Sequence, residues 1–187
     1  MTARCWWTGR WTSSARSGRC RRPTAHPGSP SKARIVDGTT VYAGGGFTRA
    51  NDHGVLHLDA HYVAMWDGAH WSPIGVGGPG LNSAVDSILV DGTDVYIGGR
   101  FTNASNAGVN LPSADYIARW DGSVWTALGA GMGGEVYALT RLSNGDLIAG
   151  GLFITAGGIT VNHVARWNGS VWSPLGSGEE RRVIRRP

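Results

Sequence analysis

Short apolar runs alternate with turn-forming residues over most of the chain, and the pattern returns three times. One run ends in two glycines and is followed by an aromatic residue; its copies are residues 41–48, 95–102 and 147–153. A second block carries two Trp residues around an Asp-Gly or Asn-Gly pair; its copies are residues 62–71, 116–125 and 163–172. Recurrence of both blocks about every 50 residues is typical of a repeat architecture.

Each repeat contains four short runs with the composition of β-strands. In the second copy we expect strands over residues 85–90, 95–101, 116–120 and 124–129. Asp-Gly and Asn-Gly pairs between such runs predict tight hairpin turns, at Asp37-Gly38, Asp67-Gly68, Asp91-Gly92, Asp121-Gly122, Asn144-Gly145 and Asn168-Gly169. The two Trp residues that flank each second turn should then face each other across the hairpin. We expect essentially no helix.

Four antiparallel strands in each period of about 50 residues are typical of a β-propeller blade. A β-helix repeats at a shorter period, and an immunoglobulin-type sandwich does not repeat within about 100 residues. The sequence therefore predicts an all-β fold: a β-propeller segment of about three four-stranded antiparallel blades. Because closed propellers need about 4–8 blades, the segment is open or part of a larger propeller.

The repeat resembles a kelch-type repeat, with a double glycine, an aromatic residue and a later Trp. More closely, it is similar to tandem repeats of the form GGxFT…ARWDGxxWxxLG, in the galactose-oxidase-like propeller superfamily. The resemblance covers residues 35–178 and implies an extracellular or cell-surface protein. A WD-type propeller is the runner-up because of Trp66-Asp67 and Trp120-Asp121, but the period exceeds the roughly 40–45 residues of that repeat, and Asn168 replaces the Asp.

Charge is divided unevenly along the chain, whose formal net charge is +4. Residues 1–34 carry a charge of +8 and residues 179–187 carry +2, whereas residues 35–178 carry −6. A nucleic-acid-binding domain has its basic residues on one folded face. Since the basic residues here lie in the two ends, we expect no nucleic-acid partner.

The two ends also lack the repeat. Residues 1–34 contain no Val, Leu, Ile or Phe, so we expect either a disordered basic tail or a mistranslated segment read from out-of-frame DNA. This segment has no apolar core of a signal peptide, and it holds both cysteines as free thiols. In the basic tail 179–187, Val183-Ile184 stands where a fourth copy would start. We therefore expect the truncated start of a further repeat, and a longer parent chain whose further blades pack against these.

The sequence predicts no catalytic, metal or cofactor site. His53, His57 and His61 have a spacing that would form a metal triad on a helix, but Gly54 and the position between strands indicate a solvated loop. The Asp residues of the turns are explained by capping of their own backbone. Galactose-oxidase copper chemistry requires a Cys, and residues 35–178 have none. No apolar run approaches the length of about 20 residues that spans a membrane.

The connections between the second and third strands of each repeat, residues 48–61, 102–115 and 154–162, are long and variable. Such loops share one edge of a propeller, where binding usually occurs. We expect the binding residues among their polar side chains: Arg49, Asn51, Asp52, His53, His57, Asp59, Asn103, Asn106, Asn110, Asp115 and Asn162. The predicted function is a non-enzymatic scaffold for a protein or glycan. The alternative is a fragment of a secreted carbohydrate-active enzyme, an oxidase or hydrolase, whose catalytic residues lie outside this chain.

Overall fold

The computed structural model describes residues 11–13, 20–22, 31–52, 55–57, 60–75 and 80–175. Side chains are described for all of these except residues 11–13, 20–22, 31, 32, 52 and 55–57. The described part contains strands and no helix, which confirms the all-β prediction. None of its elements is therefore a helix that could cross a membrane.

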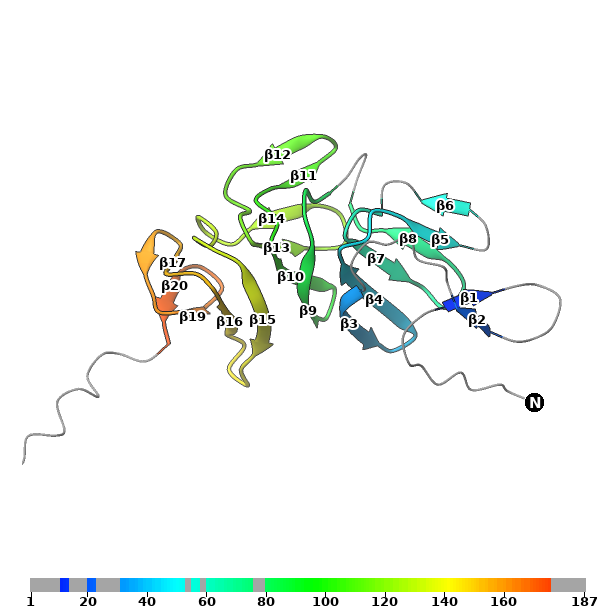
Figure 1. Ribbon diagram of the computed structural model, residues 1–187. Coiled ribbons are helices and arrows are strands. Elements are labelled where there is room, and N and C mark those ends of the chain that lie inside the picture. Colours follow the sequence, from blue (N-terminus) through cyan, green and yellow to red (C-terminus); the bar gives the residue numbers. More distant parts are fainter. Residues whose placement is uncertain are drawn as a thin grey trace, which may run out of the picture.

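Three four-stranded antiparallel sheets stand side by side along the chain (Figure 1). Blade 1 consists of β3 (Ser31–Asp37), β4 (Thr40–Gly45), β7 (Val63–Trp66) and β8 (Trp71–Pro73). Blade 2 consists of β9 (Val85–Asp91), β10 (Asp94–Gly99), β13 (Ile117–Trp120) and β14 (Trp125–Ala127). Blade 3 consists of β15 (Val136–Arg141), β16 (Leu147–Gly151), β19 (Val164–Trp167) and β20 (Trp172–Pro174). Each sheet pairs its strands in chain order, as the blade prediction requires.

The predicted turns and Trp pairs are confirmed in all three blades. The six turn glycines have φ between +58° and +104°, a region that is open to glycine and strained for other residues. Each Trp before a turn is registered with the Trp after it, and their ring centroids lie 5.6, 5.3 and 5.2 Å apart in blades 1, 2 and 3. These indole pairs lie at the end of the hairpin formed by the third and fourth strands of every blade, which we call the outer hairpin.

Three strands of blade 2 are shorter than predicted, and β13 lacks only the expected first residue, Tyr116. β10 ends at Gly99 instead of Phe101, because the register shifts at Gly98 and Gly99 and the chain leaves the sheet. Phe101 is nevertheless fully buried, so its apolar character reflects packing and not strand pairing. The fourth strand was expected over residues 124–129 and covers only Trp125–Ala127.

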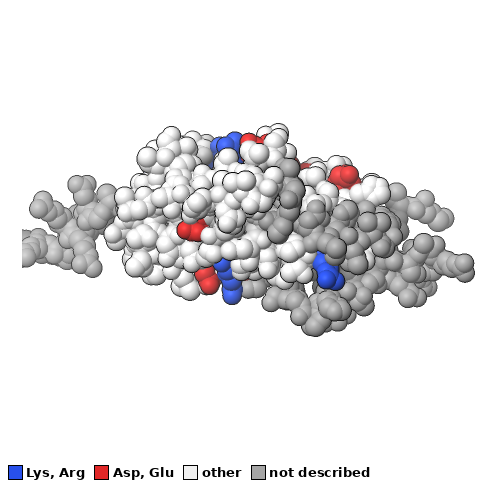
Figure 2. Space-filling model, turned by 90° about the horizontal axis from the view of Figure 1, so that it is seen from above, with Lys and Arg blue, Asp and Glu red and all other residues white. Residues whose placement is uncertain are grey.

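The connections expected to be loops contain strands of their own. A two-stranded ribbon lies in each one: β5 (Ala50–Asp52) with β6 (Val55–His57), β11 (Ala104–Asn106) with β12 (Val109–Leu111), and β17 (Thr155–Ala156) with β18 (Ile159–Thr160). We call the edge of the blades that carries these ribbons the ribbon face; Figure 2 looks onto it from above. The tight Asp-Gly and Asn-Gly turns belong to the opposite edge, the turn face.

The first strand of blade 1 extends four residues before residue 35, where the apolar residues of the repeat begin. β3 starts at Ser31 and pairs with β4 from Ser31↔Gly45 onward, in the register that Val85↔Gly99 has in blade 2. Backbone pairing with β4 therefore maintains the strand where the apolar side chains of the repeat are missing. The predicted unstructured segment 1–34 also holds β1 (Trp11–Ser13) and β2 (Cys20–Arg22), which pair antiparallel; its other residues before 31 lie outside the described part.

The double glycine that ends β10, the second strand of blade 2, has two different structural reasons. A Cβ on Gly98 would lie 2.5 Å from Val136 Cγ1 of the next blade, closer than real contacts allow. A Cβ on Gly99 would overlap the carbonyl oxygen of Ala84 and lie 2.9 Å from Val85 Cα, both within its own blade. The first glycine therefore admits the neighbouring blade, and the second admits the adjacent backbone at the bulge.

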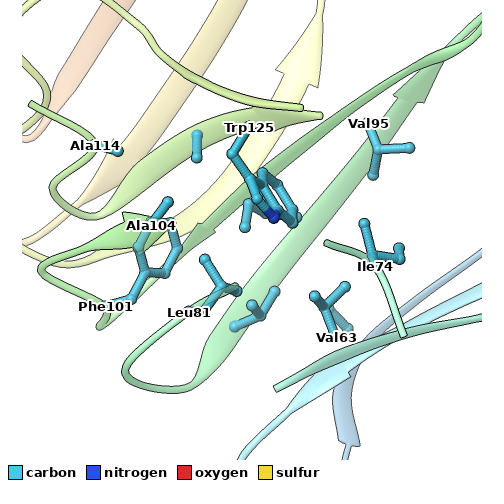
Figure 3. Packing of buried hydrophobic residues seen from close by; sticks show 12 residues of the cluster. Val63, Ile74, Leu81, Val95, Phe101, Ala104, Ala114 and Trp125 are labelled. Atoms are coloured by element: carbon cyan, nitrogen blue, oxygen red, sulfur yellow. The ribbon is translucent and has the colours of Figure 1, made fainter. Parts of the chain in front are cut away.

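The apolar core is continuous from blade to blade. Figure 3 shows Trp125 of β14 surrounded by residues of its own blade and of blade 1, including Val63 and Ile74. A second cluster joins blades 2 and 3 and contains Ile117, Val136 and Trp172. Adjacent blades thus bury the faces that they turn toward each other, as in other repeat proteins.

Polar contacts also cross the seam between blades 2 and 3. Leu139 N–H donates to Ser87 Oγ at 3.0 Å, which joins the first strands β15 and β9. Arg100 Nε lies 2.9 Å from Asp86 Oδ2 in its own blade and 3.8 Å from Glu135 Oε2 in the next. Arg141 of β15 pairs with Asp91 of β9. The first strands of adjacent blades are therefore held side by side by both apolar and ionic contacts.

Acid should weaken the outer hairpins of blades 1 and 2 more than that of blade 3. The N–H groups of Val124 and Ser123 donate to Asp121 and hold the pKa of its carboxyl below the ordinary value. A group with a lowered folded-state pKa stabilises above its unfolded pKa, and this stabilisation is lost as pH falls through the folded pKa. Asn168 accepts the same two bonds in blade 3 without ionising.

We therefore expect Asp121→Asn to keep its stability at neutral pH and to lose less stability than the unchanged protein below about pH 4, near the ordinary aspartate pKa. Urea midpoints across this pH range measure the effect. Identical pH profiles for the two proteins would contradict this reading of the turn.

Candidate functional site

A hollow of about 320 Å³ opens on the ribbon face at the seam between blades 1 and 2. Blade 1 contributes His61 and Tyr62, which precede β7, and the link between the blades contributes Leu81 and Asn82. The remaining wall comes from the ribbon connection of blade 2, with Asn103, Ser105, Gly108 and Asn110. The hollow therefore exists only because two adjacent blades are packed together.

Tyr62 occupies a left-handed backbone conformation, with φ of 68°. Its N–H donates to Phe47 O at 2.7 Å, and its carbonyl accepts from Gly45 N–H at 2.9 Å. The equivalent residues Tyr116 and His163 have φ of 62° and 63° and make the same two kinds of bond. Since the strain recurs in every blade and is offset by these bonds, we attribute it to the architecture, where it sets the entry to each third strand.

Asn82 is fixed by three hydrogen bonds to the connection that follows β10. Its Oδ1 accepts from the N–H groups of Thr102 at 2.9 Å and Asn103 at 3.2 Å. Its Nδ2 donates to Thr102 Oγ1 at 3.0 Å. Asn82 therefore lines the hollow and ties the inter-blade link to the ribbon connection.

Asn103 and Asn110 face each other across the ribbon connection. Asn103 Nδ2 donates to Asn110 Oδ1 at 2.7 Å. Asn103 Oδ1 and Asn110 Nδ2, an acceptor and a donor, remain for a ligand. An amide pair of this kind can bind a hydroxyl group or a peptide group, each of which both donates and accepts.

The described lining of the hollow combines amide and hydroxyl groups with aromatic and aliphatic surface. Among the described residues, the lining has no Asp, Glu, Lys or Arg, and its ionisable side chains are His61 and Tyr62. The rings of these two residues are arranged edge to face, with centroids 6.0 Å apart and an interplanar angle of 82°. Figure 2 shows few charged side chains on the described part of the ribbon face, some of them beside a side chain of opposite charge. These features favour a neutral ligand that combines hydroxyl groups with an apolar surface.

Among the residues predicted to bind, the structure brings Asn103 and Asn110 together in the hollow. Asn106 has a structural role instead: its Nδ2 donates to Trp125 O at 2.9 Å, and its Oδ1 accepts from Trp125 N–H at 2.7 Å. These two hydrogen bonds to the β14 backbone attach the ribbon to the fourth strand of the blade. The Asn106 amide is therefore engaged in contacts within the fold.

Asp115 and Asn162 occupy the position that His61 has in blade 1, just before the left-handed residue. Asp115 lies at the seam with blade 3, where its carbonyl accepts from Met132 N–H at 3.1 Å. Burial raises the pKa of its carboxyl. Asn162 is exposed in blade 3. The three equivalent residues therefore lie in three different blades and do not form one site.

The predicted residues of blade 1 are only partly described. Arg49 and Asn51 are exposed beside and within β5. The side chains of Asp52 and His57 are not described, and His53 and Asp59 lie outside the described residues. His57 belongs to the extended strand β6, so the helical spacing of a His53, His57 and His61 triad does not apply. In the part of the chain that is described, no group of three or more His, Cys, Asp or Glu side chains could hold a metal ion.

Sequence reasoning missed Tyr62, Leu81, Asn82 and Ser105 as parts of one site. A signal for two of them was available, because inter-blade links and second–third connections share one edge of a propeller. Leu81 and Asn82 belong to the link that follows blade 1, which is three residues longer than the link that follows blade 2, measured from Trp71 to Val85 and from Trp125 to Val136.

A second hollow, of about 270 Å³, lies on the turn face between blades 2 and 3. It is lined by turn residues such as Asn144 and Asn168 and by Tyr96, Arg141 and Asp146. Asp146 is already paired, with Arg166 Nε at 3.0 Å from its Oδ2. Burial, with a smaller effect of Asp94, raises the pKa of the Tyr96 hydroxyl. The charged residues of this second hollow, Arg141 and Asp146, already form ion pairs between blades and between strands. The ribbon-face hollow is therefore the stronger candidate for a binding site.

Comparison with known proteins assigns no family to this chain. No protein-family model matches it, and no curated protein matches it significantly.

Proposed function

We propose that the protein is a non-enzymatic β-propeller scaffold that binds a glycan or a protein through its ribbon face. The observation that carries the proposal is the hollow at the seam of blades 1 and 2, whose described lining has no Asp, Glu, Lys or Arg and places the amide groups of Asn103 and Asn110 in the same hollow as Tyr62. Neutral sugars present hydroxyl groups around an apolar ring face, and amide and aromatic side chains complement both. Among the two ligand classes, the hollow therefore favours a neutral glycan.

The kelch-like assignment and a location at the cell surface are part of this proposal. The kelch-like assignment is supported by the double glycine and the Asp-Gly turn between two Trp residues, which in blade 2 form the bulge and the hairpin of the third and fourth strands. The location follows from that resemblance. The architecture explains why those positions recur, and the ribbon connections between them differ in sequence from blade to blade. A framework that is the same in every repeat, with connections that vary along one edge, is typical of binding scaffolds.

Binding to immobilised neutral and charged glycans, followed by titration calorimetry with the glycans that bind, tests the proposal. We expect Asn110→Ala to weaken binding about 3- to 10-fold, the range for one net hydrogen bond. Asn110 is exposed, so loss of its hydrogen bond from Asn103 should lower the urea midpoint only slightly. Asn162→Ala is the matched control, because it removes an exposed asparagine from the equivalent connection of blade 3.

Equal weakening by Asn110→Ala and Asn162→Ala would place the binding site elsewhere. Binding of charged glycans alone would contradict the ligand class. Incubation of each bound glycan with the protein tests the alternative of a carbohydrate-active enzyme, because hydrolysis or oxidation would appear as a new product.

A further inference from the structure

Adjacent blades meet in the same contact at both seams. A valine at the start of each following blade fills the space left by the first glycine of the preceding double glycine. A Cβ on Gly44 would lie 2.6 Å from Val85 Cγ1, and one on Gly98 would lie 2.5 Å from Val136 Cγ1. Both valines are 0% exposed. Glycine and valine thus form a hole and a knob that recur from blade to blade.

Blade 3 has the hole, but no described residue fills it. Gly150 pairs with Ala138 and Val164, as Gly98 pairs with Ser87 and Ile117 in blade 2. Among the described residues, the only atom within 4 Å of a Cβ on Gly150 is His163 O, at 4.0 Å in the same blade. No described residue therefore covers the outer face of blade 3 at the position where blades 1 and 2 receive a neighbour.

The exposure of Leu175 also indicates that no described residue covers this face of blade 3. Ile74 and Leu128 follow the fourth strands of blades 1 and 2 and are 5% and 2% exposed. Leu175 has the equivalent position in blade 3 and is 50% exposed. The difference indicates that a covering segment is missing from the described part of blade 3.

The spacing of the chain identifies a segment that fits this face. Val136 follows Trp125 by eleven residues and Leu128 by eight. Val183 follows Trp172 by eleven residues and Leu175 by eight, and it lies beyond the described residues. A connection of this length already brings Val136 from the end of blade 2 to Gly98.

We propose that the segment around Val183 docks intramolecularly on the outer face of blade 3, with Val183 in the hole over Gly150. The same residue type at the same distance along the chain makes the contact that Val136 makes with Gly98. The tether keeps the local concentration of the segment high, since the ends of a short connection cannot separate far. This proposal is independent of the glycan site, which belongs to the other seam and to the ribbon face.

Disulfide trapping tests the contact. In a background with Cys5→Ser and Cys20→Ser, the pair Gly150→Cys and Val183→Cys is oxidised, and the products are separated on a non-reducing gel and weighed. The positive control is Gly98→Cys with Val136→Cys, where the two Cβ atoms would lie 3.0 Å apart, near the roughly 3.5–4.5 Å of disulfides. The matched negative control is Gly150→Cys with Ile184→Cys, because neighbouring side chains of an extended segment point to opposite sides.

We expect the Val183 pair to form an intramolecular disulfide at least 10-fold faster than the Ile184 pair. Equal rates for the two pairs, or no disulfide with Val183, would overturn the proposal. A covalent dimer would also overturn it, because it would identify a second copy of the chain as the occupant. As a second measurement, Val183→Asp should speed hydrogen exchange at Leu175, whereas Ile184→Asp should not; no change with Val183→Asp would contradict docking.

Discussion

Trp125→Ala should lower the free energy of unfolding by about 3–5 kcal/mol, the range for truncating a large buried aromatic residue. Trp125 is 1% exposed and packs between blades 1 and 2. A Cβ on Gly80 would lie 2.8 Å from its Nε1, so a bare backbone allows the indole to enter the seam. Because residues of two blades surround the indole, the cavity cannot collapse without moving one blade.

The partner residue Trp120 provides the comparison for this prediction. Among the three Trp residues that precede a turn, we expect Trp120→Ala to cost more than Trp66→Ala or Trp167→Ala, since blade 2 has a neighbour on each side. All three are only half-buried, so each should cost less than Trp125→Ala. Urea midpoints and slopes for the four variants decide the order. Equal losses for Trp125→Ala and Trp66→Ala would mean that the seam of blades 1 and 2 contributes little.

Gly98→Ala should separate blades 2 and 3 in part and cost about 1–3 kcal/mol, the usual range for overpacking. The added Cβ would lie 2.5 Å from Val136 Cγ1 and 3.0 Å from Val136 Cβ. Val136 cannot retreat easily, because it is β-branched, fully buried and part of β15. The overlap must therefore be relieved by movement between the blades.

Gly150→Ala is the matched control, at the same place of the blade-3 sheet. No described atom lies closer than 4.0 Å to its added Cβ, and alanine is less costly than glycine within a strand. We expect its unfolding free energy to stay within about 1 kcal/mol of the unchanged protein, because displacement of a short terminal segment disturbs few contacts. Equal destabilisation by the two substitutions would show that the cost arises within the strand and not between blades.

The blades were predictable from the sequence because their determinants are local. Asp121-Gly122 specifies a turn through the φ preference of glycine, and the Trp residues on either side reveal the register of the hairpin. The same short-range signals occur in every repeat, so three copies support one interpretation. Strand ends were less predictable, since the apolar residue Phe101 is buried without being paired in a sheet.

The ribbons escaped prediction because their strands are too short for an alternating pattern. The turn of the blade-2 ribbon has Ala107 and Gly108 at φ of 49° and 81°, and alanine gives no signal for a left-handed conformation. In blade 3 the corresponding residues are Gly157-Gly158, with φ of 57° and 82°, and this pair was a usable hairpin signal. The hollow itself depends on how two blades meet, and no single stretch of sequence encodes that.

The order of hole and knob along the chain has a consequence for biosynthesis. Each glycine hole lies in the second strand of one blade, and the valine that fills it begins the next blade. During synthesis from the N-terminus, the receiving surface is therefore complete before its partner leaves the ribosome. The nascent chain can then fold from its N-terminus toward its C-terminus, because each new blade packs against the blade that has already folded.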